Sequence, residues 1–302
     1  MTARMTTPLP PLVSADWLAR ELGAPDLLVL DATLFLPAHG RDARAEYEAE
    51  RIPGAIFMDL KRFQPLPEPE RLRAMLDALR VHEGVRAVVY DNSPLHSAAR
   101  GWWLLRHAGM DAAVLDGGPN AWRALNPPRN GEGDREPQAR GGGGGTVTPN
   151  DMRHTGAVAS ASPPSPLATV PLPVPGRISK DDLLPSALPI LDARSGPRFR
   201  GQEAEPRPDI APGHIPGSRN LPYADLFNPD GTYRAPDDLR AAFTAAGVDP
   251  AQPFVATCGS GVTASNLILA AQLLGNEDAR LYDGSWTEWG ADPATPKAVG
   301  PA

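Results

Sequence analysis

An internal repeat constrains the fold of this chain more than any other feature of its 302 residues. Four sequence motifs occur twice and in the same order, and the distance between the two copies drifts only slightly along the chain. Such self-similarity is typical of a duplicated structural unit. The pairs are LLVLDAT with LPILDAR, RIPGAIFMDL with HIPGSRNLPY, AVVYD with FVATC, and LDGGPNAW with YDGSWTEW, separated by 161, 163, 167 and 167 residues. We therefore predict two copies of one domain of about 125 residues, a common domain size.

Within each copy, short apolar segments alternate with segments of helical periodicity. The apolar segments have the length and the β-branched content of buried strands. Several helical segments begin at Ser, Asp or Thr or end at Gly, as helix boundaries prefer. Strands that alternate with helices predict a parallel sheet covered on both faces, so the predicted fold class is α/β, present twice. The strands are expected at 27–32, 86–91 and 253–258, and the helices at 14–22, 69–80, 236–247 and 263–275.

Proline and glycine separate the two copies. They are dense from Asn126 to Pro175, and five consecutive glycines stand at 141–145. A segment of this composition buries too little apolar surface to form a core. We expect an N-terminal domain at 1–128, a Pro/Gly-rich linker at 129–175 that acts as a tether, and a C-terminal domain at 176–302.

Charge and residue usage argue against several classes of function. The net charge is −7 and the basic residues form no stripe, so we expect no nucleic-acid partner. No apolar run approaches the ~18 residues of a membrane span or the core of a signal peptide, so we expect no membrane partner. The six histidines show no metal-ligand spacing, so we expect no metal and no cofactor. A single cysteine excludes an internal disulfide framework and favours a cytoplasmic location.

That single cysteine, Cys258, follows a predicted strand and precedes Gly259, Ser260, Gly261 and a helix that begins near Thr263. A lone cysteine is most often a small buried apolar residue. Here, however, a strand–turn–helix junction lifts it to the carboxyl edge of the sheet, where α/β proteins bind ligands. The two glycines permit a tight bend in which successive peptide N–H groups converge on one point. Because those dipoles favour negative charge on sulfur and the loop contains no base, we predict a nucleophilic thiolate activated by peptide dipoles.

The loop CGSGVTA at 258–264 resembles the active-site loop of the 3-mercaptopyruvate and thiosulfate sulfurtransferases, the tandem-domain rhodanese family. The resemblance covers most of both predicted domains but not the linker. It extends through VSADWLARELGAPDLLVLDAT near the N-terminus, RFRGQEAEPRP at 198–208, GHIPGSRNLPY at 213–223 and LYDGSWTEWG at 281–290. It implies two tandem rhodanese-like domains, each a parallel sheet flanked by helices.

The resemblance also implies a mechanism. Cys258 would take the sulfur of 3-mercaptopyruvate, release pyruvate and hold the sulfur as a persulfide. Cyanide or a thiol acceptor such as thioredoxin would then collect that sulfur. Ser260 would lie beside the sulfur and offer its hydroxyl to the substrate or to the departing enolate. The loop amides that would stabilise the thiolate and the persulfide include those of Gly259, Gly261, Val262 and Thr263.

Two arginines match the family's substrate-binding arginines, Arg198 and Arg207. Guanidinium groups suit the carboxylate of mercaptopyruvate, because they donate two parallel hydrogen bonds. Thiosulfate-preferring relatives usually place Arg and Lys after the cysteine, whereas Gly259 and Ser260 are neutral here. The expected donor is therefore 3-mercaptopyruvate, with a thiosulfate-preferring rhodanese as the alternative.

The N-terminal copy departs from the family in two ways. Arg51 stands where the family usually has a His that, together with an acid matching Asp42, has been proposed to assist catalysis. In addition, Asp91 occupies the position of the cysteine and Pro94 removes a loop amide. We expect this copy to be catalytically silent and to form one wall of the site, with His96 as a packing or surface residue.

Three other interpretations compete with this one. A Cys-dependent phosphatase needs an arginine six residues after the cysteine, where this chain has Ala264. A dinucleotide-binding protein fits the G-x-G-x-x-A pattern from Gly259 to Ala264, but that fingerprint normally occupies the first strand–helix turn of its domain. A non-catalytic sulfur carrier or interaction module remains compatible with an intact cysteine loop. Turnover with small sulfur donors separates the carrier from the enzyme.

Overall fold

The computed structural model describes residues 8–126 and 176–301. The predicted linker at 129–175 lies outside the described residues, so its role as a tether stays a prediction. The two repeats together belong to one compact unit.

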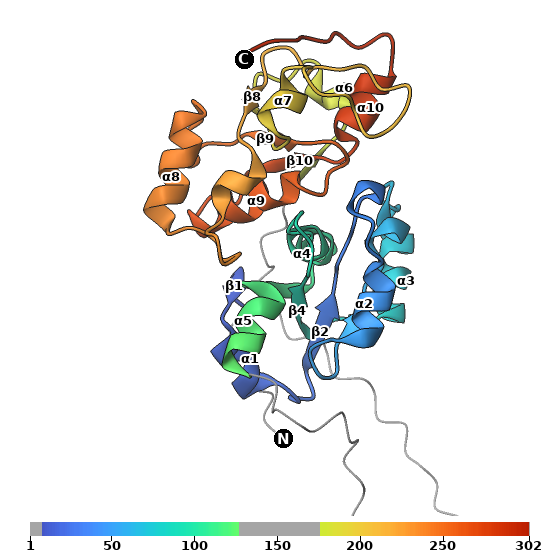
Figure 1. The fold of residues 1–302 in the computed structure, drawn as a ribbon, viewed down its shortest axis with the longest axis vertical. Coiled ribbons are helices and arrows are strands. Elements are labelled where there is room, and N and C mark those ends of the chain that lie inside the picture. Colours follow the sequence, from blue (N-terminus) through green and yellow to red (C-terminus); the bar gives the residue numbers. More distant parts are fainter. Residues whose placement is uncertain (1–7, 127–175, 302) are drawn as a thin grey trace, which may run out of the picture. The chain divides into compact units, whose positions relative to one another are not determined.

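The N-terminal repeat is a five-stranded parallel sheet with the strand order β1-β5-β4-β2-β3 (Figure 1). Pro69 begins one of its helices, and Ser14 caps another by accepting the Trp17 N–H, so local signals set these boundaries. Its elements are β1 Leu12–Val13, α1 Ala15–Glu21, β2 Leu27–Asp31, the short 3₁₀ helix η1 Pro37–His39, α2 Ala43–Ala49, β3 Ile56–Phe57, η2 Leu60–Phe63, α3 Pro69–Ala78, β4 Arg86–Tyr90, α4 Ala98–His107, β5 Asp111–Leu115 and α5 Gly118–Leu125.

The C-terminal repeat has the same topology, with the strand order β6-β10-β9-β7-β8 and parallel pairing throughout. Each strand takes the place of its counterpart in the first sheet, which confirms the predicted α/β fold in two copies. The elements are β6 Gly176–Ile178, α6 Lys180–Leu183, β7 Ile190–Asp192, α7 Gly196–Phe199, β8 Arg219–Asn220, η3 Tyr223–Leu226, α8 Pro236–Ala245, β9 Val255–Thr257, α9 Ala264–Leu273, β10 Arg280–Tyr282 and α10 Ser285–Ala291.

Helices cover both faces of each sheet. Successive side chains of a strand point to opposite faces, so neighbouring residues of one strand pack against different helices. In β4, Val88 belongs to the same apolar cluster as Leu18 of α1, whereas the next residue, Val89, belongs to the cluster of Trp102 of α4. The second cluster continues into the C-terminal repeat, where α9 packs against α4. A continuous apolar core therefore joins the two repeats.

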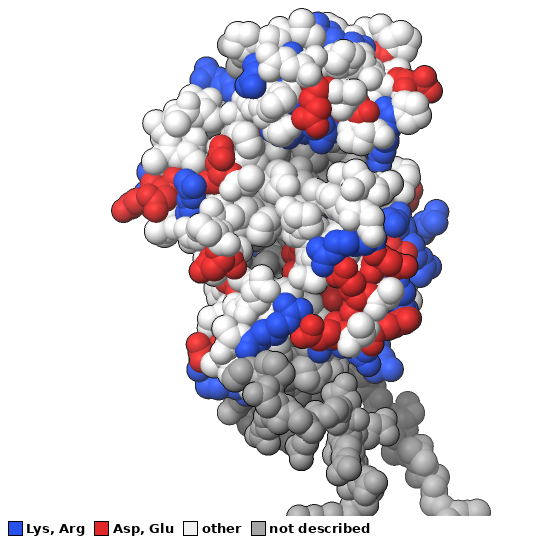
Figure 2. All heavy atoms as spheres, in the orientation of Figure 1, with Lys and Arg blue, Asp and Glu red and all other residues white. Residues whose placement is uncertain are grey.

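The surface carries charges of both signs. On the face drawn in Figure 2 they are interspersed, and they are densest over the region of α2, where salt bridges join Arg41 to Glu46 and Arg44 to Glu48. Among the described residues, none of the helices combines the length and the hydropathy needed to cross a bilayer.

Candidate active site

Cys258 lies directly after β9 at the carboxyl edge of the C-terminal sheet, and α9 begins six residues later. The predicted strand–turn–helix junction is therefore present. The bend includes Gly261 at φ +77°, a conformation that favours glycine. The cysteine is only 1% exposed, and it adjoins the apolar cluster shared by the two repeats. A substrate can reach this sulfur only if part of the loop or its cover moves.

The start of α10 holds the first residues of the loop. The Cys258 N–H donates to Ser285 Oγ at 3.2 Å, and the Trp286 N–H donates to the Cys258 carbonyl at 2.9 Å. The Thr287 N–H donates to the Gly259 carbonyl at 2.9 Å. These bonds turn two loop carbonyls toward α10, away from the peptide N–H groups that follow.

The peptide N–H groups of residues 259–264 have no hydrogen-bond acceptor within the described ranges. Buried peptide donors are almost always paired in folded proteins, so a run of six unpaired donors is unusual. They belong to the six residues that directly follow Cys258. The arrangement can stabilise an anion there, either a thiolate or a persulfide.

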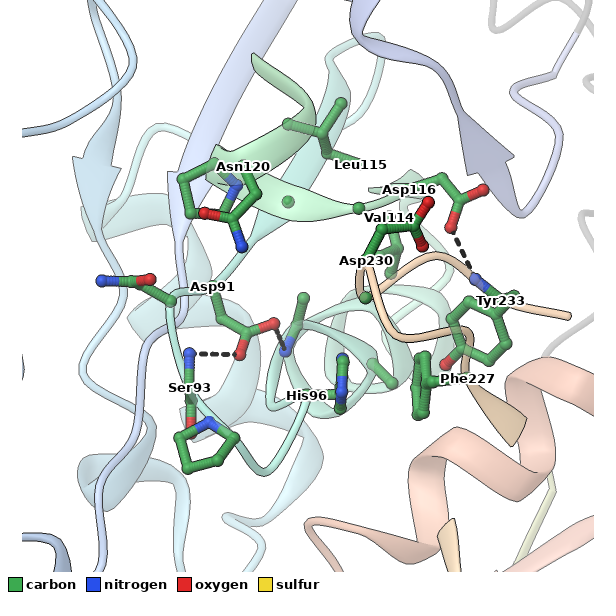
Figure 3. Close-up of a pocket in the computed structure, with 18 of the residues that line it drawn as sticks. Asp91, Ser93, His96, Val114, Leu115, Asp116, Asn120, Phe227, Asp230 and Tyr233 are labelled. Atoms are coloured by element: carbon green, nitrogen blue, oxygen red, sulfur yellow. Dashed lines mark hydrogen bonds between the residues drawn. The ribbon is translucent and has the colours of Figure 1, made fainter. Parts of the chain in front are cut away.

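The N-terminal repeat contains the same loop with an anion already in it. At the position equivalent to Cys258, the Asp91 carboxylate accepts N–H bonds from Ser93, Ser97 and Ala98, each at 3.0 Å. Figure 3 shows the bond from Ser93. Burial nevertheless raises the pKa of Asp91 to about 6, because it outweighs those three bonds. Three peptide N–H groups of this loop thus converge on one carboxyl group, although its burial makes ionisation harder than in water.

A cavity of about 330 Å³ opens beside Asp91 (Figure 3). Its walls come from both repeats: Asp116 and Asn120 belong to the N-terminal repeat, and Phe227 and Asp230 belong to the C-terminal repeat. Asp91 is an acceptor-only group whose oxygens are occupied by peptide donors, so it offers no nucleophile for sulfur. That the N-terminal copy is catalytically silent stays a prediction.

His96 lies at the edge of the same cavity (Figure 3). Its ring stacks on Phe227 with the centroids 3.5 Å apart, and burial lowers its pKa to about 4. The neutral imidazole therefore packs between the repeats, as expected from the sequence.

The two predicted substrate arginines both approach the cysteine loop. A Cβ placed on Gly259 would stand 3.1 Å from Arg198 Nη2, so this guanidinium lies against the bend. Arg207 Nη1 donates to Thr287 Oγ1 at 2.9 Å, and that hydroxyl in turn donates to the Gly259 carbonyl. Two side chains that are nine residues apart in sequence thus converge on one peptide of the loop.

The sequence interpretation missed the partner of Arg198. Glu205 is buried and pairs through one carboxylate oxygen with Arg198 and through the other with Arg194. Arg194 is fully buried and also pairs with Asp192, so it has a structural role. Glu205 lies between the two predicted substrate arginines in the sequence, but a charged segment does not show which acid pairs with which base.

The other loop residues lie as the motif suggests. Val262 and Thr263 are buried where α9 begins, and Ser260 is partly exposed. The N-terminal repeat covers this part of the loop, because Gln64 Nε2 donates to the Ser260 carbonyl at 3.3 Å. Tyr223 lies nearby; burial raises its phenol pKa, and Cys258 raises it further.

Arg51, which replaces the family's His, and Asp42, which matches the family's acid, lie at opposite ends of α2. Asp42 caps that helix by accepting the Arg44 and Ala45 N–H groups. Arg51 donates to the Tyr47 carbonyl, and its guanidinium lies over the Tyr47 ring, 5.0 Å from the centroid. Each therefore has a local role at an end of α2.

No group of three or more His, Cys, Asp or Glu side chains that could hold a metal occurs in the part of the chain that the structure describes. The chemistry that the geometry supports is nucleophilic attack by sulfur, with peptide dipoles for the anion and guanidinium groups for a carboxylate.

Comparisons with known proteins agree with this chemistry. The family model for the rhodanese-like domain matches residues 14–125 and 177–292. The human 3-mercaptopyruvate sulfurtransferase is 38% identical over 92% of this chain and 91% of its own length. The enzyme of the same name from Escherichia coli (strain K12) is 32% identical over 92% and 94%.

Solved structures give the same result. The crystal structure of SseA from Escherichia coli, described as a 3-mercaptopyruvate sulfurtransferase with a rhodanese fold, has a TM-score of 0.66 at 29% identity and covers 92% of this chain and 99% of its own. The crystal structure of the Tum1 protein from Saccharomyces cerevisiae has a TM-score of 0.74 at 26% identity, with coverage of 98% and 100%.

Proposed function

This chain belongs to the rhodanese-like family and is a sulfurtransferase, and from that premise we propose that it transfers the sulfur of 3-mercaptopyruvate through a persulfide on Cys258. The observation that carries this proposal is the run of unpaired peptide N–H groups at 259–264 around the only cysteine of the chain. Asp91 supports it, because the equivalent loop binds a carboxylate.

The first half-reaction forms a sulfur–sulfur bond. The Cys258 thiolate attacks the sulfur of 3-mercaptopyruvate, and the carbon–sulfur bond breaks. The electron pair of that bond leaves with the three-carbon fragment as the enolate of pyruvate, which then takes up a proton. Ser260 is a partly exposed residue of the loop, and its hydroxyl donates a hydrogen bond to this enolate. The products are pyruvate and a Cys258 persulfide, whose negative charge the loop amides stabilise.

The second half-reaction regenerates the enzyme. A thiolate or cyanide attacks the outer sulfur of the persulfide, and the sulfur–sulfur bond breaks with its electron pair returning to Cys258. The product is the persulfide of the acceptor thiol, or thiocyanate. A thiol protein such as thioredoxin is the acceptor class that we propose, because the chain offers no second cysteine to receive the sulfur.

Arg198 and Arg207 bind the donor in this proposal. Both approach the Gly259 peptide, and a carboxylate between them would receive charge-assisted hydrogen bonds close to the sulfur. Glu205 holds Arg198 in the free enzyme, so the substrate carboxylate exchanges with the Glu205 carboxylate at that guanidinium.

The neutral residues that follow the cysteine favour this donor over thiosulfate. Thiosulfate carries two negative charges beside the sulfur to be transferred, and Gly259 and Ser260 supply no cation to balance them. We therefore expect a higher kcat/KM for 3-mercaptopyruvate. A single cysteine that cycles through thiolate and persulfide also fits a reducing compartment, and we place the enzyme in the cytoplasm.

The experiment is mass spectrometry of the protein after incubation with 3-mercaptopyruvate. The expected result is one added sulfur on the peptide that contains Cys258 and its loss on addition of cyanide or a dithiol. The matched control is Cys258→Ser, which should gain no sulfur. An unmodified wild-type peptide, together with pyruvate release no greater than that of the control, would overturn the proposal. Sulfur uptake without repeated turnover would identify a carrier instead of an enzyme.

A further inference from the structure

Arg100 is a buried charge from the N-terminal repeat that reaches the cysteine loop of the C-terminal repeat. It belongs to α4 and is 1% exposed. Its Nη2 lies 2.5 Å from Asp283 Oδ1, and Nη1 stands 3.4 Å from the point where a Cβ on Gly261 would lie. The guanidinium therefore touches the base of the bend that contains the unpaired amides.

The environment of Arg100 does not satisfy its hydrogen-bonding capacity. None of its three guanidinium nitrogens has an acceptor in hydrogen-bonding geometry among the described residues, although the contact with Asp283 pairs the two charges. A buried charge with unmet donors costs free energy, and an apolar side chain of similar volume often stabilises such a position more. Apart from a cation–π contact with Trp103, whose ring centroid lies 5.0 Å from the guanidinium carbon, the described residues give no stability reason for an arginine here.

Asp283 connects Arg100 to the cysteine. It lies between β10 and α10, two residues before Ser285, whose hydroxyl accepts the Cys258 N–H. Its second oxygen accepts the N–H of Leu66, at 3.3 Å, which also belongs to the N-terminal repeat. Both oxygens of the Asp283 carboxylate thus contact the N-terminal repeat, one through Arg100 and the other through Leu66.

The duplication supplies an internal comparison. Asp116 is the counterpart of Asp283 and accepts the Tyr233 N–H at 2.9 Å from the opposite repeat, just as Asp283 accepts the Leu66 N–H. At the same offset of 167 residues, however, the counterpart of Arg100 is Leu267. The two sites share the carboxylate and its peptide donor, and the arginine accompanies only the site with the cysteine.

We propose that Arg100 is a positioning residue for the cysteine loop, a role that rests on the sulfurtransferase function proposed above. It neutralises the Asp283 carboxylate and, through it, fixes the bend at Gly261 so that the amides of residues 259–264 point at the sulfur. Without this cation, an uncompensated carboxylate beside the loop opposes negative charge on Cys258. The silent repeat contributes to catalysis in this way.

The test uses the alkylation of Cys258 by iodoacetamide as a function of pH, since this is the only cysteine of the chain. Arg100→Leu introduces the residue type of its counterpart in the other repeat, Leu267. We expect it to raise the pH midpoint of alkylation by about one unit and to lower the rate at neutral pH about tenfold. We expect kcat to fall in the same proportion while KM for 3-mercaptopyruvate changes less than about threefold.

Companion variants separate positioning from folding. Arg100→Lys keeps the charge and should restore most of the alkylation rate. Arg100→Leu combined with Asp283→Asn should recover part of it, because the uncompensated carboxylate is gone. Asp116→Asn alters the equivalent carboxylate of the silent site and should leave the alkylation midpoint unchanged. Urea unfolding of each variant shows which of them are folded.

A wild-type alkylation midpoint in folded Arg100→Leu would overturn the proposal. If that variant does not fold, Asp283→Asn decides the question, because it breaks the same ion pair, and an unaltered midpoint in this variant would overturn the proposal equally. Alkylation needs no sulfur donor, so its outcome is independent of the proposed substrate. A shifted midpoint in a protein that takes no sulfur from 3-mercaptopyruvate would support the positioning role and refute only the donor.

Discussion

Asp91 offers a direct measure of how the loop of this fold treats an anion. Three peptide N–H groups donate to its carboxylate and lower its pKa, but burial outweighs them and raises the pKa to about 6. The pKa of an aspartate in an unfolded chain is about 3.9. Because the folded protein holds this proton more tightly, the stabilising contribution is fully present below about pH 3.9 and is lost as the pH rises through 6.

The size of the effect follows from the two pKa values. A difference of about two units corresponds to about 3 kcal/mol, of which about 2 kcal/mol disappears between pH 4.5 and pH 7. Asp91→Asn removes the titration with little change in size. The free energy of unfolding of this variant, measured with urea, should therefore gain about 2 kcal/mol relative to wild type over that range. Asp225→Asn at an exposed position is the matched control.

Two results would contradict this reasoning. If the difference between wild type and Asp91→Asn stays constant from pH 4.5 to pH 7, the carboxyl does not titrate in this window. If the free energy of unfolding of wild type instead rises relative to that of the variant as the pH rises, the three amides outweigh burial. The loop would then be a stronger anion site than the structure indicates. In either case, the free energy of unfolding of Asp225→Asn should change with pH as that of wild type does.

The remaining predictions concern the catalytic loop and its substrate. Cys258→Ser should abolish turnover while the urea unfolding transition survives; substantial residual activity would end the single-nucleophile mechanism. Arg198→Ala and Arg207→Ala should each raise KM for 3-mercaptopyruvate about tenfold or more, as the loss of a charge-assisted hydrogen bond predicts, and an unchanged KM would exclude the residue from donor binding. Gly261→Ala should cost about 1–2 kcal/mol for its positive φ and lower kcat, because the new Cβ would stand 2.9 Å from the Asp283 carbonyl; wild-type kinetics would show that the bend tolerates displacement. The ratio of kcat/KM for 3-mercaptopyruvate to that for thiosulfate should exceed one, and a steady-state assay with both donors checks it.

The sequence was sufficient to predict features that depend on the local residue pattern and on the internal repeat. The strand before Cys258 and the helix after it follow from apolar runs, glycine and chain direction, and the structure places β9 and α9 there. The equivalence of Asp91 and Cys258 required only the offset between the copies. Arg198 and Arg207 of the RFRGQEAEPR segment also approach the loop, Arg198 from α7 and Arg207 through Thr287 of α10.

The sequence could not supply contacts that depend on how the two copies pack. Gln64, Leu66 and Arg100 reach the second loop from the first repeat, and nothing in their local sequence marks them as neighbours of Cys258. The pairing of Glu205 with Arg198 was equally hidden, because a charged segment does not reveal which acid meets which base. The near-complete burial of Cys258 also comes only from the packed structure.

The proposed function gives the N-terminal repeat a part in the reaction of the other repeat. Under that proposal, the peptide N–H groups at 259–264 stay available for sulfur, and such groups are costly when left unpaired in a buried bend. In the first repeat, Asp91 accepts three such bonds, so that loop contains its own acceptor. The second loop has no such acceptor and needs support from elsewhere. Gln64 and Arg100 contact it from the first repeat, and Leu66 holds Asp283 beside it, so we infer that the first repeat keeps the second loop in its shape.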